Sequence, residues 1–288
     1  MKISRIKYHD PAAAEQLSSS LQRTGFCILE DAPIDDWLIQ QVYQSWQEWF
    51  HQSQSLKNIY KIPKDSIGGY ASKQEIAKNA QTHDLKEIFD HYKHTPTPKE
   101  LEPKTKELFQ CLNAIGTTCA QWVHQGIPES ISSKWKKSLH ELIDDKNRSV
   151  LRIAYYPGLT GQEPPSAQRA SAHEDINMLT IQPAPTSEGL QARDISGQWH
   201  DIPLKPNQLI IKAGEMLSEF TEKYIQATSH RVITPVPVRG KLSRIATPYF
   251  LQFESATNFP ENRTSDQLLE QRLKEVHLMD SKASLVRC

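Results

Sequence analysis

The sequence between Ser171 and Arg244 contains, in this order, His173-Glu174-Asp175, Gly189-Leu190, Gly197-Gln198-Trp199, His230-Arg231-Val232 and Ser243-Arg244. Side chains alternate between the two faces of a strand. In a strand that runs on into Met178–Gln182, His173 and Asp175 would therefore project to one side and Glu174 to the other. We expect a second, β-branched strand over 226–235 to deliver His230 to the same place. Neutral imidazoles and an ionised carboxylate are suitable ligands for a divalent metal.

Two histidines and one carboxylate cover one face of a metal ion and leave the opposite face open. This arrangement is typical of non-heme Fe(II) oxygenases. The His-x-Asp pattern alone is weak, because a chain with eleven histidines contains it by chance at about even odds. The order of the motifs around it makes the metal-site hypothesis more specific.

The chain resembles the isopenicillin N synthase-like family of iron- and 2-oxoglutarate-dependent oxygenases. The residues that carry the likeness, over about 148–253, are Leu151–Pro157, His173–Asp175, Leu179–Ile181, Gly189-Leu190, Gly197–Trp199, Ala213–Leu217, His230–Val232 and Ser243–Phe250. A weaker likeness lies upstream, in Thr24–Ile28, Gly69-Tyr70 and Lys86–Phe89.

The resemblance implies a mainly β fold with flanking helices, in which a double-stranded β-helix, or jelly roll, encloses the metal. Short β-rich runs separated by Gly, Pro and Asn after Val150 are compatible with that core. We therefore expect an N-terminal α/β region with helices over 1–146, the jelly-roll core over 147–256 and a C-terminal helical segment over 257–288, all in one compact unit.

The resemblance also implies an enzyme, a dioxygenase that binds Fe(II) through His173, Asp175 and His230. Such an enzyme uses O2 and the co-substrate 2-oxoglutarate, releases succinate and CO2, and hydroxylates or otherwise oxidises a small molecule, with ascorbate as a candidate reductant. Arg244 would anchor the far carboxylate of 2-oxoglutarate, because a guanidinium fork matches a carboxylate. Tyr156 would donate a hydrogen bond to the same ligand.

Three positions depart from the family pattern: Ala246 replaces a serine, Asn177 a glycine and Lys212 an asparagine. Ala246 removes one hydroxyl from the co-substrate site, and Thr247 points to the opposite face by strand parity. Asn177 and Lys212, with Tyr70 and Phe89, are our candidate substrate contacts. A Lys212 facing the cavity would be an unmatched cation and would favour an acidic substrate, whereas a Lys212 at a strand end would extend into water.

Two other functions remain open at this level. Within the same family, some oxidases use Fe(II) without 2-oxoglutarate, and oxygen consumption in its absence would identify them. A catalytically inactive jelly-roll binding module is disfavoured because the three ligand positions and the arginine are all present.

Composition sets outer limits on the class of protein. The 288 residues are 38% hydrophobic and carry 34 basic and 34 acidic side chains, so nothing indicates a nucleic-acid partner. The chain has neither an apolar signal peptide nor a run approaching the ~20 apolar residues that span a bilayer. We therefore expect a cytoplasmic protein without a membrane partner.

Hydrophobic periodicity predicts the remaining elements. We expect strands over 3–8 and 24–30 on either side of a helix over 12–22, and a helix from Asp35 or Asp36 to Phe50. Mostly irregular structure should follow over 61–103. The remaining expected helices run from about Leu108 to Gly126, from about Ser133 to Ile143 and over 264–279.

Overall fold

A nine-stranded sheet forms the centre of the protein. The computed structural model describes residues 1–62, 67–72, 84–144, 148–159, 163, 168–233, 242–260 and 263–275. In this part of the chain the large sheet has the order β1-β2-β10-β7-β13-β5-β4-β3, and β12 also pairs with β5. Its strands are β1 (Ser4–Lys7), β2 (Phe26–Glu30), β3 (Gly69–Ser72), β4 (Glu87–His91), β5 (Val150–Tyr156), β7 (Leu179–Pro183), β10 (Gln208–Ala213), β12 (Arg244–Ala246) and β13 (Tyr249–Leu251).

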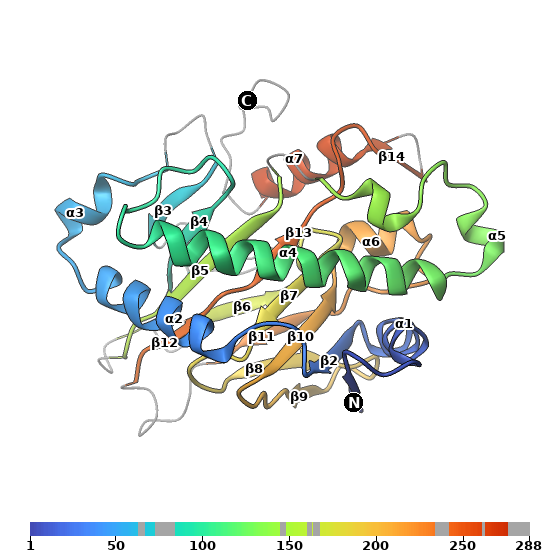
Figure 1. Cartoon of the computed structure of the whole chain (residues 1–288), viewed down its shortest axis with the longest axis horizontal. Coiled ribbons are helices and arrows are strands. Elements are labelled where there is room, and N and C mark those ends of the chain that lie inside the picture. Colours follow the sequence, from blue (N-terminus) through green and yellow to red (C-terminus); the bar gives the residue numbers. More distant parts are fainter. Residues whose placement is uncertain are drawn as a thin grey trace.

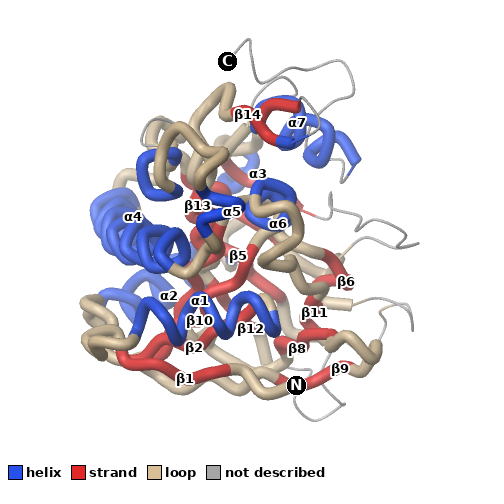
Figure 2. The backbone as a smooth tube through the Cα atoms, turned by 90° about the vertical axis from the view of Figure 1, so that its right-hand side faces the viewer, coloured by secondary structure: helices blue, strands red, loops and turns tan. Residues whose placement is uncertain are grey.

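A four-stranded sheet with the order β6-β11-β8-β9 packs against one face of the large sheet (Figure 2). Its strands are β6 (Ala170–His173), β8 (Leu190–Arg193), β9 (Trp199–Asp201) and β11 (His230–Val232). Gly197, with a φ of 85°, lies in the turn between β8 and β9, which pair as an antiparallel hairpin. A short pair, β14 (Asn258–Phe259) with β15 (Arg263–Thr264), lies outside both sheets.

Two apolar clusters fill the space between the sheets. One joins Phe26, Ile28 and Ile210 of the large sheet to Leu190 and Ala192 of the small sheet. The other is made of Ala71, Ile88, Ala154, Tyr156, Ala170 and Val232. The cavity described below is lined by members of both clusters. The predicted mainly β fold with a jelly-roll core is confirmed.

Helices cover the other face of the large sheet (Figures 1 and 2). The longest, α4 (Glu102–Gln125), runs across that face, and α1 (Ala13–Thr24) and α2 (Asp36–Phe50) pack beside it. Asp35 caps α2 by accepting a hydrogen bond from the Trp37 N–H, and Gly25 ends α1 with a φ of 69°. Because both faces of the sheet are covered, all residues of β7 and β10 are buried.

The remaining helices are short or peripheral. They are α3 (Gln54–Asn58), α5 (Glu129–Ser132), the 3-10 helix η1 (Leu139–Leu142), α6 (Glu215–Phe220) and α7 (Ser265–Glu275). The main core cluster extends from Ile6 to Leu269, so the N-terminal elements pack on the core strands. Among the described helices, none combines the length and apolar character that crossing a membrane requires.

Several local predictions were wrong, and in most of these places tertiary contacts outweigh local pattern. The segment expected to be mostly irregular is so among its described residues, but the prediction missed β3 and β4, which pair with each other and join the large sheet through β5. Of the helix expected over 133–143 only the short 3-10 helix η1 forms, and α5 ends before that segment begins. The strand expected over 226–235 begins only at His230; residues 234–235, like residues 276–279 of the last predicted helix, lie outside the described residues.

Candidate metal centre

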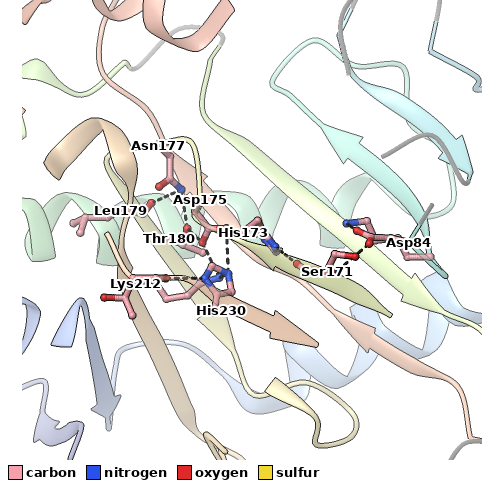
Figure 3. Close-up of polar contacts among 11 residues, drawn as sticks. Asp84, Ser171, His173, Asp175, Asn177, Leu179, Thr180, Lys212 and His230 are labelled. Carbon is pink, nitrogen blue, oxygen red and sulfur yellow. Dashed lines mark hydrogen bonds and ion pairs between the residues drawn. The ribbon is translucent and has the colours of Figure 1, made fainter. Parts of the chain in front are cut away.

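The three predicted metal ligands come together between the sheets. His173 ends β6 and His230 begins β11, and the two are cross-strand partners with ring centroids 4.5 Å apart. The Oδ1 atom of Asp175 lies 3.6 Å from Nε2 of His173 and 3.4 Å from Nε2 of His230. Each side chain offers one ligand atom, and the three atoms lie within 4.8 Å of one another (Figure 3).

Backbone carbonyls orient both imidazoles. The Nδ1 atom of His173 lies 2.7 Å from the Ser171 carbonyl oxygen, and Nδ1 of His230 lies 3.2 Å from that of Thr228. A carbonyl only accepts, so the proton of each neutral ring is assigned to Nδ1 and the lone pair to Nε2. Both lone pairs are then available for a metal ion, and the second hydrogen bond fixes each ring.

The two carboxylate oxygens of Asp175 have different partners. Oδ1 faces the histidines, whereas Oδ2 accepts a hydrogen bond from Thr180 Oγ1 and forms an ion pair with the Lys212 ammonium, each at 2.7 Å. Burial by itself would raise the pKa of Asp175, but Lys212, His230 and His173 hold that pKa well below its usual value. The carboxylate is therefore ionised without a metal.

Lys212 lies inside the protein, because its strand, β10, occupies the middle of the large sheet. The residue is 4% exposed, and Nζ lies 3.1 Å from Nε2 of His230 as well as 2.7 Å from Asp175. The alternative of a lysine extending into water was therefore wrong, and so was the expectation of a cation without a partner. Burial, followed by the charge of Lys212, lowers the pKa of His230 to about 4.

The expected single strand from His173 to Gln182 is interrupted, because the chain crosses here from the small sheet to the large one. The backbone N–H groups of Gly214, Glu215 and Met216, at the start of α6, donate to carbonyls of the crossing segment 175–178. A Cβ on Gly214 would lie 2.1 Å from the carbonyl oxygen of Asn177, so only glycine permits this close approach. Asp175 is thus held by a tightly packed loop.

Asn177 does not reach the cavity, although strand parity with His173 and Asp175 in the expected strand would have pointed it there. Its side chain is fully buried and donates from Nδ2 to Thr180 Oγ1 at 2.7 Å and to the Leu179 carbonyl at 3.2 Å. It therefore supports the hydroxyl that binds Asp175. The parity argument failed because Asn177 belongs to the crossing segment and not to a strand.

Tyr70 and Phe89 also lie away from the cavity. They are partners in the β3–β4 pair and pack on the helix-covered face of the large sheet, around Trp46 and Trp49. The Tyr70 hydroxyl donates to Glu87. Neither side chain lines the cavity, so this geometry does not support their predicted role as substrate contacts.

Arg244 and Tyr156 lie together in the cavity wall. They are cross-strand partners, and the guanidinium carbon of Arg244 is 5.0 Å from the centre of the Tyr156 ring. Arg244 is 1% exposed and donates from Nε to the Ser187 carbonyl at 2.9 Å. Its Nη1 and Nη2 have no hydrogen-bond partner among the described residues. Ala246 lines the same cavity, whereas Thr247 contacts Tyr43 on the opposite face, in agreement with the parity argument.

Sequence reasoning missed some residues of this site. Thr180 is one, and its signal was a lone hydroxyl in an apolar strand. Lys86 and Arg152 also line the cavity; Lys86 pairs with Asp84 at 3.0 Å, and Arg152 binds Asp90 through two parallel hydrogen bonds. Both cations lie in stretches that carry the family likeness, Lys86–Phe89 and Leu151–Pro157, but no sequence pattern assigned either of them to the site.

The donor set fits the proposed ligands. One carboxylate and two imidazole nitrogens converge on a common point, as a borderline divalent metal requires. Buried guanidinium nitrogens without partners are costly, and a carboxylate of 2-oxoglutarate would satisfy them. When bound, Fe(II) supplies the open positions at which the keto acid and O2 react.

Comparison with known proteins agrees with this site. Residues 147–253 match the model of the 2OG-Fe(II) oxygenase superfamily, and residues 2–116 match that of the non-haem dioxygenase in morphine synthesis N-terminal region. Jasmonate-induced oxygenase 4 from Arabidopsis thaliana is 24% identical over 247 residues, which cover 83% of this chain and 68% of that protein.

Solved structures share the whole fold. A candidate oxygenase from Shewanella oneidensis is 32% identical and superposes with a TM-score of 0.84 over 97% of this chain and all of its own. The structure of JOX2 in complex with 2OG, Fe and JA, at 18% identity, shares the fold with a TM-score of 0.78 over 99% of this chain and 87% of its own. The chain therefore belongs to the 2OG-Fe(II) oxygenase superfamily, and it is a 2-oxoglutarate-dependent dioxygenase that oxidises a small molecule.

Proposed function

We propose that this enzyme binds 2-oxoglutarate through Arg244, assisted by Tyr156, and oxidises a small molecule that carries a carboxylate. Among the cavity arginines, Arg152 already uses its fork on Asp90. Arg244 has both terminal nitrogens without a partner in the described part of the chain. This difference favours Arg244 as the anchor, because a buried fork gains most from a bidentate carboxylate.

The charges of the site support an anionic substrate. Lys86 and Arg152 are each matched by an aspartate. The metal dication, Lys212 and Arg244 then carry four positive charges, and Asp175 with dianionic 2-oxoglutarate supplies three negative ones. Pairing Lys212 with Asp175 does not change this balance, because the metal shares the same carboxylate. One buried positive charge remains, and a substrate anion would reduce its cost.

Matched pairs of compounds test the substrate class. Small carboxylic acids and their neutral amides should be supplied to the iron-loaded enzyme with 2-oxoglutarate, and succinate release should be measured. We expect acids to stimulate release and the corresponding amides to do so at least tenfold less. Equal stimulation by both members of each pair would contradict an acidic substrate, and substrate oxidation without 2-oxoglutarate would contradict the co-substrate assignment.

A further inference from the structure

Lys212 contacts two of the three metal ligands at once. Its ammonium lies 2.7 Å from Oδ2 of Asp175 and 3.1 Å from Nε2 of His230, inside a site where it is 4% exposed (Figure 3). Thr180 completes the partners of the same carboxylate oxygen. The ammonium is therefore buried beside the ligands and almost completely shielded from solvent.

The contact with His230 uses the atom that a metal needs. Nδ1 of His230 is directed at the Thr228 carbonyl, so Nε2 carries the lone pair. An ammonium only donates, and the hydrogen bond must run from Lys212 to this lone pair. One lone pair serves one partner, so a metal bound to Nε2 excludes the hydrogen bond from Lys212.

Asp175 has no such conflict. Its Oδ1 faces both histidines, and its Oδ2 faces Lys212 and Thr180. A metal on Oδ1 leaves the ion pair on Oδ2 in place. Metal binding thus costs the contact between Lys212 and His230 but retains the contact between Lys212 and Asp175.

We propose that Lys212 acts as a stand-in cation in the metal-free protein, where it occupies the metal-binding nitrogen of His230 and must release it when the metal enters. Lys212 thereby keeps Asp175 paired in the absence of metal and weakens metal binding, through the lost hydrogen bond and through repulsion between two cations that share one carboxylate. The positive charge that stays beside Asp175 also favours a divalent over a trivalent ion. This inference is independent of the identity of the substrate.

Removing the positive charge of Lys212 should tighten metal binding and lower the stability of the metal-free protein. We suggest Lys212→Met, and Lys212→Asn as a second variant of smaller, polar character in case the first does not fold. Titration with Co(II) or Zn(II), with the Co(II) absorption spectrum as readout, should show at least roughly tenfold tighter binding, equivalent to about 1.4 kcal/mol. The Tm of the metal-free variants should fall, and the rise in Tm on adding metal should be larger than in the wild type.

Lys57→Met is the matched control. Lys57 is another buried lysine, 6% exposed and 2.6 Å from Glu87, but it does not line the cavity. Its loss should lower the Tm of the metal-free and metal-bound protein equally and leave the metal Kd unchanged. Lys212 variants that bind metal as the wild type does, or more weakly, would overturn the proposal.

Discussion

Thr180 donates a 2.7 Å hydrogen bond to Oδ2 of Asp175 in a setting where the hydroxyl is fully buried and the carboxylate nearly so. The same hydroxyl oxygen accepts a hydrogen bond from Asn177. A short chain of side chains thus runs from the crossing segment through β7 to a metal ligand. The Thr180 hydroxyl donates to the charged carboxylate of Asp175, which makes this hydrogen bond stronger than one between neutral groups.

Thr180→Val should therefore destabilise the protein despite its similar shape. Loss of a hydrogen bond to a buried carboxylate costs about 1.5–3 kcal/mol of unfolding free energy. Urea denaturation of the metal-free protein measures this loss. Thr180→Ser keeps the hydroxyl and should lose less than half as much; a valine variant as stable as the wild type would show that Lys212 alone satisfies Asp175.

Gly214→Ala should weaken metal binding through the backbone. The added Cβ would meet the carbonyl oxygen of Asn177 at 2.1 Å, so the segment that carries Asp175 has to shift. We expect Co(II) affinity to fall roughly tenfold, about 1.4 kcal/mol, together with a lower Tm.

Gly197→Ala provides the comparison for this variant. Its φ of 85° makes alanine unfavourable by about 1–2 kcal/mol, but the residue lies in the turn between β8 and β9. Its Tm should fall without a change in Co(II) affinity. Equal Co(II) affinities for the wild type and Gly214→Ala would mean that the segment moves without carrying Asp175 away.

The ligand set was predictable from sequence because it depends on residue type and order. His173, Asp175 and His230 converge as their motifs implied, although Asp175 reaches the histidines from a loop and not from a strand. The positions of Tyr70 and Phe89 were not predictable from the motifs. Which face of β4 turns towards the cavity depends on its pairing with β5, a contact across more than fifty residues of sequence.

The partner of Lys212 was equally unpredictable from the sequence. Strand alternation leaves its side chain on the cavity face or at a strand end, and only the packing of β10 between β2 and β7 buries it. The distance to Asp175 depends on the loop held by α6, which no local pattern describes. Sequence thus predicted the chemistry of the metal ligands, and tertiary structure determines what surrounds them.

His91 should make stability depend on pH. It is 1% exposed, and Nδ1 lies 2.7 Å from Thr97 Oγ1. Burial, with a smaller effect of Lys106, lowers its pKa from 6.5 to about 4. As pH falls through this window the unfolded chain binds a proton that the folded protein does not, so stability is complete above pH 6.5 and is lost towards pH 4.

The loss attributable to His91 should reach about 3 kcal/mol between pH 6.5 and 4. Urea denaturation at several pH values should compare the wild type with His91→Gln, which has no titrating ring. As pH falls, the unfolding free energy of the wild type should decrease more than that of the variant. A difference independent of pH would show that the pKa of His91 is the same in the folded and unfolded states, so that burial does not lower it.

Arg244 and Ala246 should affect the 2-oxoglutarate requirement in opposite directions. Arg244→Gln removes the unpaired fork, and loss of a charge-assisted bond of about 1.5–3 kcal/mol should raise the KM for 2-oxoglutarate roughly 10- to 150-fold. Ala246→Ser restores a hydroxyl on the same cavity wall, and a neutral hydrogen bond of about 0.5–1.5 kcal/mol should lower that KM several-fold.

Thr247→Val is the control, because Thr247 contacts Tyr43 away from the cavity, and its KM should match the wild type. The KM of the wild type and the three variants is obtained from oxygen consumption and succinate release at varied 2-oxoglutarate concentrations. An unchanged KM in Arg244→Gln would remove this arginine from the co-substrate site and leave Arg152 as the next candidate, since it is the other arginine among the residues that line the described cavity.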